Sequence, residues 1–236
     1  MNIVPVPLQR AYAEVQARLR AAETRYGRPP GSVALLAVSK TQPPEAVAAL
    51  AALGQRAFGE NYVQEALAKS QALADLPLDL EWHFIGPLQA NKARQIAENF
   101  AWVHSLDREK MVRRLAALRP DRLPPLNCLV EVNVSGEATK SGIPLAALPD
   151  FLPLVAAEPR LRLRGLMAMP APQADLDAQR AAMRPLAEAF RSPALACHGL
   201  DTLSLGTSAD LEAAVAEGTT LVRIGTALFG PRVPVA

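Results

Sequence analysis

Lys40 stands at the end of an apolar run, where a lysine can do covalent chemistry. Six apolar residues, 33–38, lie between Gly31 and the Pro43-Pro44 pair, which is typical of a strand buried on both faces in a parallel sheet. Ligands bind at the carboxyl ends of such strands. A partly desolvated lysine has a lowered pKa, and its neutral amine can attack a carbonyl to form a Schiff base. The position also suits a solvated strand end, so the surrounding residues must decide between the two.

Two glycine-hydroxyl pairs farther along the chain indicate an anion site. Gly206-Thr207-Ser208 and Gly225-Thr226 each follow a short apolar run. Glycine allows close backbone approach, and the N–H groups at a helix start attract phosphate. Barrels of eight βα units commonly hold phosphate in their seventh and eighth loops. Either pair alone is also compatible with an ordinary helix N-cap, and the two together favour phosphate.

Arg223 is a cation inside an apolar strand pattern, between Val222 and Ile224, and points to the opposite side from them. A buried arginine must be paired or must bind something, so a structural salt bridge and a ligand contact are both open. An arginine can also face a pyridine nitrogen. Combined with a Schiff-base lysine and a phosphate site, it makes pyridoxal 5′-phosphate (PLP) the candidate cofactor.

The composition argues against several other classes of protein. The formal charge of +2 is spread over intermixed residues without a basic stripe, so nucleic acid is not an expected partner. No run of 18 apolar residues and no cationic leader is present, which predicts a cytoplasmic protein without a membrane partner. Cys128 and Cys197 belong to no CxxC pair, and His83 and His104 lack metal-ligand spacing. We expect no metal, and we interpret the two histidines as core or wall residues.

The elements that must position these residues alternate along the chain. Strands are expected at 33–38, 56–59, 81–86, 101–105, 127–134, 161–169, 202–205 and 220–224. Helices are expected at 7–26, 45–53, 60–73, 87–99, 107–118, 145–157, 175–190 and 209–217. Such alternation predicts right-handed βαβ units and a parallel sheet, and eight units at this length predict an α/β fold with a single closed (β/α)8 TIM barrel.

The first predicted helix, 7–26, precedes the barrel and is expected to cover one end of the domain. The chain contains no linker, low-complexity segment or short-period repeat that would mark a second domain. We therefore expect one PLP-binding barrel domain over 1–236, with the leading helix and cap in 1–30 and the barrel in 31–232.

Seven segments between residues 33 and 232 resemble, in the right order, those of a known family. They are LLAVSKTQPPEAV, FGENYVQEA, EWHFIGPLQANK, HSLDREK, VNVSGEATKSGI, RGLMAMPAP and LSLGTSADLEAAVAEGTTLVRIGTALFG. The third segment and the VRIGTALFG part of the last are the most specific. Together they resemble the YggS/PROSC family, the pyridoxal phosphate homeostasis proteins. The resemblance implies a barrel like the N-terminal domain of alanine racemase. Such a protein holds PLP as a lysine aldimine and acts in intracellular PLP homeostasis as a buffer or carrier, without an established catalytic reaction.

The resemblance also implies which residues contact the cofactor: Lys40, Asn61, Ser208, Arg223, Gly225 and Thr226. Lys40 would be the Schiff-base lysine, and Asn61 would lie beside the cofactor ring. Ser208 and residues 225–226 would bind the phosphate, and Arg223 would face the pyridine nitrogen.

Thr207 departs from the family pattern, which usually has methionine there, so that edge of the pocket is expected to be more polar. Met167 and Met169 could line the floor of the pocket, although packing in the core is the simpler interpretation.

The main alternative is a PLP-dependent amino-acid racemase of the alanine racemase type. Racemisation needs a base on each face of the substrate carbanion, and in that racemase the second base is a tyrosine from a C-terminal β domain. This chain ends at Ala236, and its tyrosines are Tyr12, Tyr26 and Tyr62. Two of them lie in the leading helix, while Tyr62 follows a strand end. We expect no racemase activity.

A further alternative is an aldolase that uses Lys40 on a sugar phosphate, with Glu60 as the nearby acid or base. Lys140 is a second amine that could reach the rim, and a transfer role and a solvated one both stay open. The expected partners are PLP itself and the PLP-dependent apoenzymes that would receive it. The expected oligomeric state is a monomer, because no exposed apolar stripe stands out.

Overall fold

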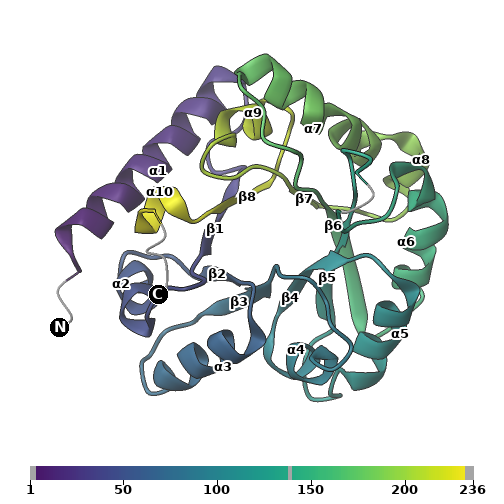
Figure 1. Cartoon of the computed structure of the whole chain (residues 1–236), viewed down its shortest axis with the longest axis horizontal. Helices are drawn as coiled ribbons and strands as arrows, with labels where there is room; N and C mark the ends of the chain where they lie inside the picture. Colours follow the sequence, from purple (N-terminus) through teal and green to yellow (C-terminus); the bar gives the residue numbers. More distant parts are fainter. Residues whose placement is uncertain (1–3, 138–139, 232–236) are drawn as a thin grey trace.

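Eight parallel strands close into one barrel in the computed structural model, which describes residues 4–137 and 140–231 (Figure 1). The strands are β1 (Ala34–Val38), β2 (Ala57–Glu60), β3 (Glu81–Phe84), β4 (Trp102–Leu106), β5 (Leu126–Glu131), β6 (Leu161–Met167), β7 (Thr202–Ser204) and β8 (Leu221–Ile224). Each strand pairs with the next along the chain, and β8 pairs with β1. The predicted (β/α)8 barrel is confirmed.

Helices form an outer ring around the barrel (Figure 1). They are α1 (Val6–Arg25), α2 (Pro44–Ala52), α3 (Val63–Ala72), α4 (Ala93–Asn99), α5 (Glu109–Leu118), α6 (Leu148–Ala156), α7 (Leu176–Arg191), α8 (Pro193–Ala196), α9 (Leu211–Ala216) and α10 (Thr226–Phe229), with a 3₁₀ turn, η1 (Leu145–Ala147), before α6. The sequence pattern gave no range for α8 or α10, although a helix start was expected at Gly225-Thr226. Both are four residues long, too short for a helical period to be visible.

The segment before α4 differs most from the sequence prediction. A helix was expected from residue 87, but α4 begins only at residue 93. The carbonyl of Leu88 accepts a hydrogen bond from Arg108 (2.7 Å), and that of Ala90 accepts one from Arg114 (2.9 Å). Because arginines at the start of α5 and within it satisfy these carbonyls, the segment does not need helical hydrogen bonds.

Strands β5 and β6 are also shorter than predicted, since β5 was expected to continue to residue 134 and β6 to residue 169. Beyond β5 the backbone pairs with a returning loop. The N–H of Ile143 donates to the carbonyl of Glu131 (2.9 Å), and the N–H of Asn133 donates to the carbonyl of Ile143 (2.9 Å). This local pairing replaces the continued sheet ladder.

Helix α1 lies along the side of the barrel and packs on α9, α10 and α2 (Figure 1). The expectation that it covers an end of the domain is therefore wrong. Its buried face includes Val15 and Leu19, which join the apolar layer between the sheet and the helices. Glu23, which is 1% exposed, accepts hydrogen bonds from the N–H groups of Gly31 (2.9 Å) and Val33 (2.8 Å). This carboxylate ties α1 to the entry of β1.

Within the described ranges, no helix is both long and apolar enough to cross a membrane. The prediction of one domain over 1–236 includes residues 1–3, 138–139 and 232–236, which lie outside the described part.

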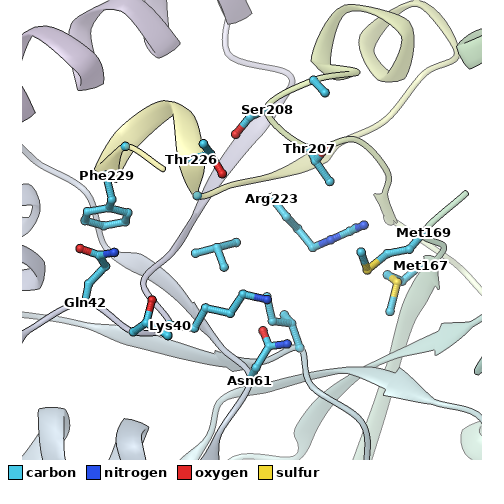
Figure 2. A pocket seen from close by; sticks show the side chains of 16 residues that line it. Lys40, Gln42, Asn61, Met167, Met169, Thr207, Ser208, Arg223, Thr226 and Phe229 are labelled. Carbon is cyan, nitrogen blue, oxygen red and sulfur yellow. The ribbon is translucent and has the colours of Figure 1, made fainter. Parts of the chain in front are cut away.

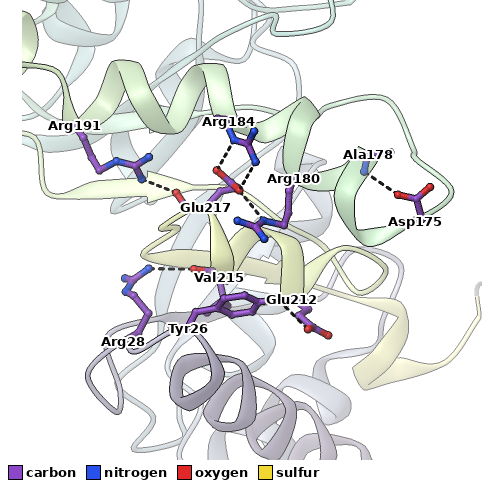
Figure 3. A network of polar contacts seen from close by, with 10 residues as sticks. All are labelled: Tyr26, Arg28, Asp175, Ala178, Arg180, Arg184, Arg191, Glu212, Val215 and Glu217. Carbon is purple, nitrogen blue, oxygen red and sulfur yellow. Dashed lines mark hydrogen bonds and ion pairs between the residues drawn. The ribbon is translucent and has the colours of Figure 1, made fainter.

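Glu217, just after α9, connects α9 to α7 (Figure 3). Its carboxylate accepts hydrogen bonds from Arg180 (2.8 Å) and Arg184 (3.4 Å), and its carbonyl accepts one from Arg191 (2.7 Å). Burial raises the pKa of Glu217, but the hydrogen bonds from Arg180 and Arg184 outweigh it and leave the pKa below its ordinary value. The ionised carboxylate therefore stabilises this corner of the fold.

We expect Glu217→Gln to lower the free energy of unfolding near neutral pH by about 1–3 kcal/mol, because a charged hydrogen-bond acceptor is lost. The folded-state pKa of Glu217 lies below the unfolded value, so its stabilisation is present above the unfolded pKa and is lost as pH falls through the folded pKa. Urea titrations should show the difference between wild type and variant shrink below a pH of about 4. A difference that does not change with pH would contradict this assignment.

Candidate functional site

A cavity of about 460 Å³ opens where the strands end, at the face that carries the site in barrels of this kind (Figure 2). Its volume lies within the range of about 300–1,000 Å³ that is common for ligand pockets. Sixteen residues line it, including all six that the sequence predicts to contact a cofactor: Lys40, Asn61, Ser208, Arg223, Gly225 and Thr226. The barrel thus brings Lys40 and Thr226, which are 186 positions apart in the sequence, to the same cavity.

Lys40 follows β1, and its side chain extends into the cavity with the amine directed toward Asn61 (Figure 2). Asn61 follows β2 in the same way. The Oδ1 atom of Asn61 is buried and accepts no hydrogen bond from the described residues. A buried amide oxygen without a donor is costly, so a donor group on a ligand would complete this wall of the cavity.

The seventh and eighth loops meet at one corner of the cavity. Ser208 Oγ accepts a hydrogen bond from the N–H of Ala227 (3.1 Å), which joins the loop after β7 to the first turn of α10. The hydroxyls of Ser208 and Thr226 lie side by side at this corner (Figure 2). Gly225 is the N-cap of α10, so the alternative N-cap interpretation also holds at this loop. Hydroxyls and helix-start amides together form a donor set that suits phosphate.

Thr207 and its neighbours do not cap α9, because Asp210 occupies that N-cap position. The N–H and Oγ1 of Thr207 both donate to Asp210 Oδ1 (2.6 and 2.8 Å). The N-cap interpretation of residues 206–208 is therefore wrong. The hydroxyl proton of Thr207 is engaged by Asp210, which reduces the polarity that Thr207 gives this edge of the cavity.

Arg223 lies in β8 and is only 4% exposed. Its Nη1 donates to the carbonyl (2.8 Å) and the hydroxyl (2.6 Å) of Ser204, and its Nη2 donates to the carbonyl of Ala168 (2.9 Å). Burial lowers the pKa of Arg223 to about 10, so it is still cationic near neutral pH. Among the described residues it forms no ion pair with a carboxylate, which weighs against the salt-bridge interpretation.

The floor and the far side of the cavity contain residues to which the sequence analysis gave another role or none. Met167 and Met169 both line the cavity, although core packing was the preferred interpretation (Figure 2). Met167 lines the cavity and also packs in the core, since it is 2% exposed and packs with Trp102 inside the barrel. Met169 is 57% exposed and is therefore not a core residue. Gln42 and Phe229 face them across the cavity, and the sequence analysis missed both. The available signal for Gln42 was its place two residues after Lys40. Phe229 lies in α10, a helix whose range the sequence pattern did not give.

Two buried histidines, predicted as satisfied core or wall residues, occupy the barrel interior, but His104 Nδ1 is buried without a hydrogen-bond partner among the described residues. His83 Nδ1 and His104 Nε2 share a hydrogen bond (2.9 Å), and His83 Nε2 bonds Glu81 Oε1 (2.9 Å). Burial lowers the pKa of both histidines. In residues 4–137 and 140–231, no three His, Cys, Asp or Glu side chains are grouped to hold a metal ion.

Three residues named in the alternative interpretations lie away from the cavity lining. Glu60 is buried and accepts hydrogen bonds from Lys69 (2.7 Å) and from the hydroxyl of Ser39 (2.6 Å), so the aldolase interpretation loses its acid. Tyr62 is 59% exposed. Lys140 pairs with Glu137 (2.8 Å) in the fifth loop, beside residues 138–139, which are outside the described part.

Comparison with known proteins gives matches over almost the whole chain. Residues 12–233 match the family described as the alanine racemase N-terminal domain. A protein of Pseudomonas aeruginosa named pyridoxal phosphate homeostasis protein is 58% identical over 220 residues, which cover 93% of this chain and 94% of that protein.

Solved structures agree with this match. PipY of Synechococcus elongatus PCC7942, solved with PLP bound, is 37% identical with a TM-score of 0.77, and the alignment covers 89% of this chain and 98% of PipY. Alanine racemase from Corynebacterium glutamicum is 20% identical with a TM-score of 0.63, and the alignment covers 94% of this chain and 62% of the racemase. At that identity the racemase shares the fold only.

Proposed function

The chain belongs to the family of pyridoxal phosphate homeostasis proteins, and on this premise we propose that it binds PLP and acts in the homeostasis of that cofactor as a buffer or carrier. The observation that carries the proposal is the convergence of a lysine amine, a hydroxyl-lined corner and a buried arginine on one cavity. These are the groups that an aldehyde, a phosphate and a ring nitrogen require. The unpartnered Oδ1 of Asn61 fits a site that a ligand completes.

Each cavity residue has a chemical task in this proposal. The cofactor supplies an aldehyde that reacts reversibly with a primary amine, and Lys40 presents that amine. Ser208, Thr226 and the amide at Gly225 donate hydrogen bonds to the phosphate. Arg223 would donate an N–H to the ring nitrogen and would keep that nitrogen unprotonated, because a guanidinium group has donors but no acceptor.

We propose further that the protein catalyses no racemisation. Tyr62 is exposed and away from the cavity lining, and Tyr12 and Tyr26 lie at α1 on the outside of the barrel. No tyrosine of the described residues therefore faces Lys40 across the cavity. Arg223 also disfavours the protonated ring that withdraws electrons best from a carbanion, which weighs against transaminase-like chemistry but not against racemisation. Incubation of the loaded protein with L-alanine should give no more D-alanine than Lys40→Ala gives, and turnover above that level would favour the racemase alternative.

The remaining features of this proposal concern where the protein acts and on what. We propose a cytoplasmic monomer that passes PLP to PLP-dependent apoenzymes. The carrier role needs only reversible uptake and release at Lys40. Loaded protein should restore the activity of an added apoenzyme, and a protein that never releases its cofactor would be a store and not a carrier.

Ser208→Ala should weaken PLP binding by about 10- to 100-fold, since one hydrogen bond to a charged group contributes about 1.5–3 kcal/mol. Pyridoxal, which lacks the phosphate, serves as the matched control ligand because it cannot use Ser208. Titrations followed by absorption should therefore show a raised Kd for PLP and an unchanged Kd for pyridoxal. If both ligands lose affinity equally, Ser208 does not bind the phosphate.

A further inference from the structure

Lys69 is a buried ammonium group next to the loop that carries Lys40. It lies in α3 and is 3% exposed. Its Nζ donates to the carbonyl of Ser39 (2.6 Å), to Glu60 Oε1 (2.7 Å) and to Glu65 Oε1 (2.6 Å). Lysine has three N–H donors, so these bonds use all of them. A lysine is almost never fully buried unless it is paired, and here its partners lie around one loop.

The two carboxylates also bond to this loop directly. The hydroxyl of Ser39 donates to Glu60 Oε1 (2.6 Å), and the N–H of Thr41 donates to Glu65 Oε1 (2.5 Å). We call Glu60, Glu65 and Lys69 the Lys69 cluster. Residues on both sides of Lys40 are thus hydrogen-bonded to a single cluster of side chains.

Thr41 shows that this loop is held in a demanding conformation. Its φ is 65°, and it is the only non-glycine residue with positive φ in the described part of the chain. A β-branched residue rarely adopts this conformation, which persists only where the surroundings enforce it. The bond from the Thr41 N–H to Glu65 is such a restraint, and it acts directly after Lys40. Thr41 itself lines the cavity.

We propose that the Lys69 cluster positions Lys40 for its reaction with the cofactor aldehyde. Lys69, Glu60 and Glu65 are not among the cavity-lining residues, so they act through the backbone of residues 39–41 without touching the ligand. Reacting atoms must approach to about 3–3.5 Å with the right alignment, so a displaced loop slows the reaction even when the ligand is bound. The inference rests on the proposed function, because it assigns a task to residues behind the proposed cofactor lysine.

The competing explanation is that the cluster only fastens α3 to β1 and β2. A purely structural role would change the stability of the protein but not the reaction rate of the molecules that remain folded. The two explanations therefore predict different rates at Lys40, and this rate is the quantity to measure.

Glu65→Ala is the informative variant, because Glu65 is 26% exposed and its removal leaves the Lys69–Glu60 pair in place. Glu65→Gln is the matched control, since its amide oxygen can still accept from Thr41. Purified proteins would be mixed with PLP, and the borohydride-fixed product would be followed with time. Hydrogen exchange of residues 39–42 without PLP would report on the loop itself.

The proposal predicts that Glu65→Ala reacts about tenfold more slowly and exchanges faster at residues 39–42, and that Glu65→Gln recovers most of the rate. Ser39→Ala, which removes only the hydroxyl bond to Glu60, should show a smaller decrease in the rate of reaction with PLP. If Glu65→Ala does not fold, the rate of Ser39→Ala tests the proposal in its place. Reaction of the folded variants at the wild-type rate would overturn the inference alone. A wild type that takes up no PLP would overturn the proposed function and this inference with it.

Discussion

Lys40→Ala is expected to abolish covalent attachment of PLP and to raise the Kd for PLP by about 100-fold or more, because the covalent bond and its alignment are lost together. Lys40 is half-buried at the cavity, outside the apolar core, so the fold should be retained. The phosphate corner and Arg223 stay in place and should support weak, noncovalent binding. Titration with PLP, followed by absorption before and after borohydride, measures both effects.

The matched control is Lys110→Ala, which removes an exposed lysine at α5. It should bind PLP as the wild type does. If Lys40→Ala still holds PLP that borohydride fixes, another amine carries the cofactor. Lys140 would be the first to examine, since it is the second amine that the sequence places near the rim.

Arg223→Leu is expected to lower the free energy of unfolding by about 2–4 kcal/mol, because buried hydrogen-bond acceptors lose their donor, and to remove most PLP binding. The substitution leaves the carbonyl of Ala168 without its Arg223 donor, and it leaves the carbonyl of Ser204 with only the longer bond from the N–H of Ala168 (3.3 Å). It also removes the proposed contact to the ring nitrogen. Urea unfolding measures the first effect, and PLP titration of the folded fraction measures the second.

Arg223→Lys separates the two roles, since lysine keeps the charge but has a single donor atom in place of the planar fork. We expect partial recovery of stability and little recovery of affinity. Wild-type PLP affinity in a folded Arg223→Leu protein would show that Arg223 is a structural residue only.

The barrel was predictable because its signals are local. Each strand is a short apolar run that ends at glycine, proline or a polar residue, and the run before Lys40 shows this most clearly. The corner formed by Ser208 and Gly225 was predictable for the same reason, since a glycine beside a hydroxyl marks both loops. Arg223 could be singled out because it interrupts an apolar strand.

Other features depend on contacts between distant segments and leave no such signal. The delayed start of α4 follows from Arg108 and Arg114, which bond the carbonyls that a helix would otherwise use. In the sequence, Lys69 has the pattern of an ordinary helix lysine. Its hydrogen bond to the carbonyl of Ser39 forms only in the folded barrel. The prediction that Asn61 contacts the cofactor came from the family resemblance, because a single asparagine after a strand is not a sequence motif that indicates a binding site.

Binding of PLP to Lys40 is tested most directly by locating the site of cofactor attachment in the wild-type protein. PLP would be added to the purified protein, borohydride would fix the bond, and mass spectrometry of the digested protein would locate the added mass. We expect one modified residue, Lys40, and an absorption band that borohydride removes. Absence of any adduct, or an adduct spread over several lysines without preference for Lys40, would contradict it.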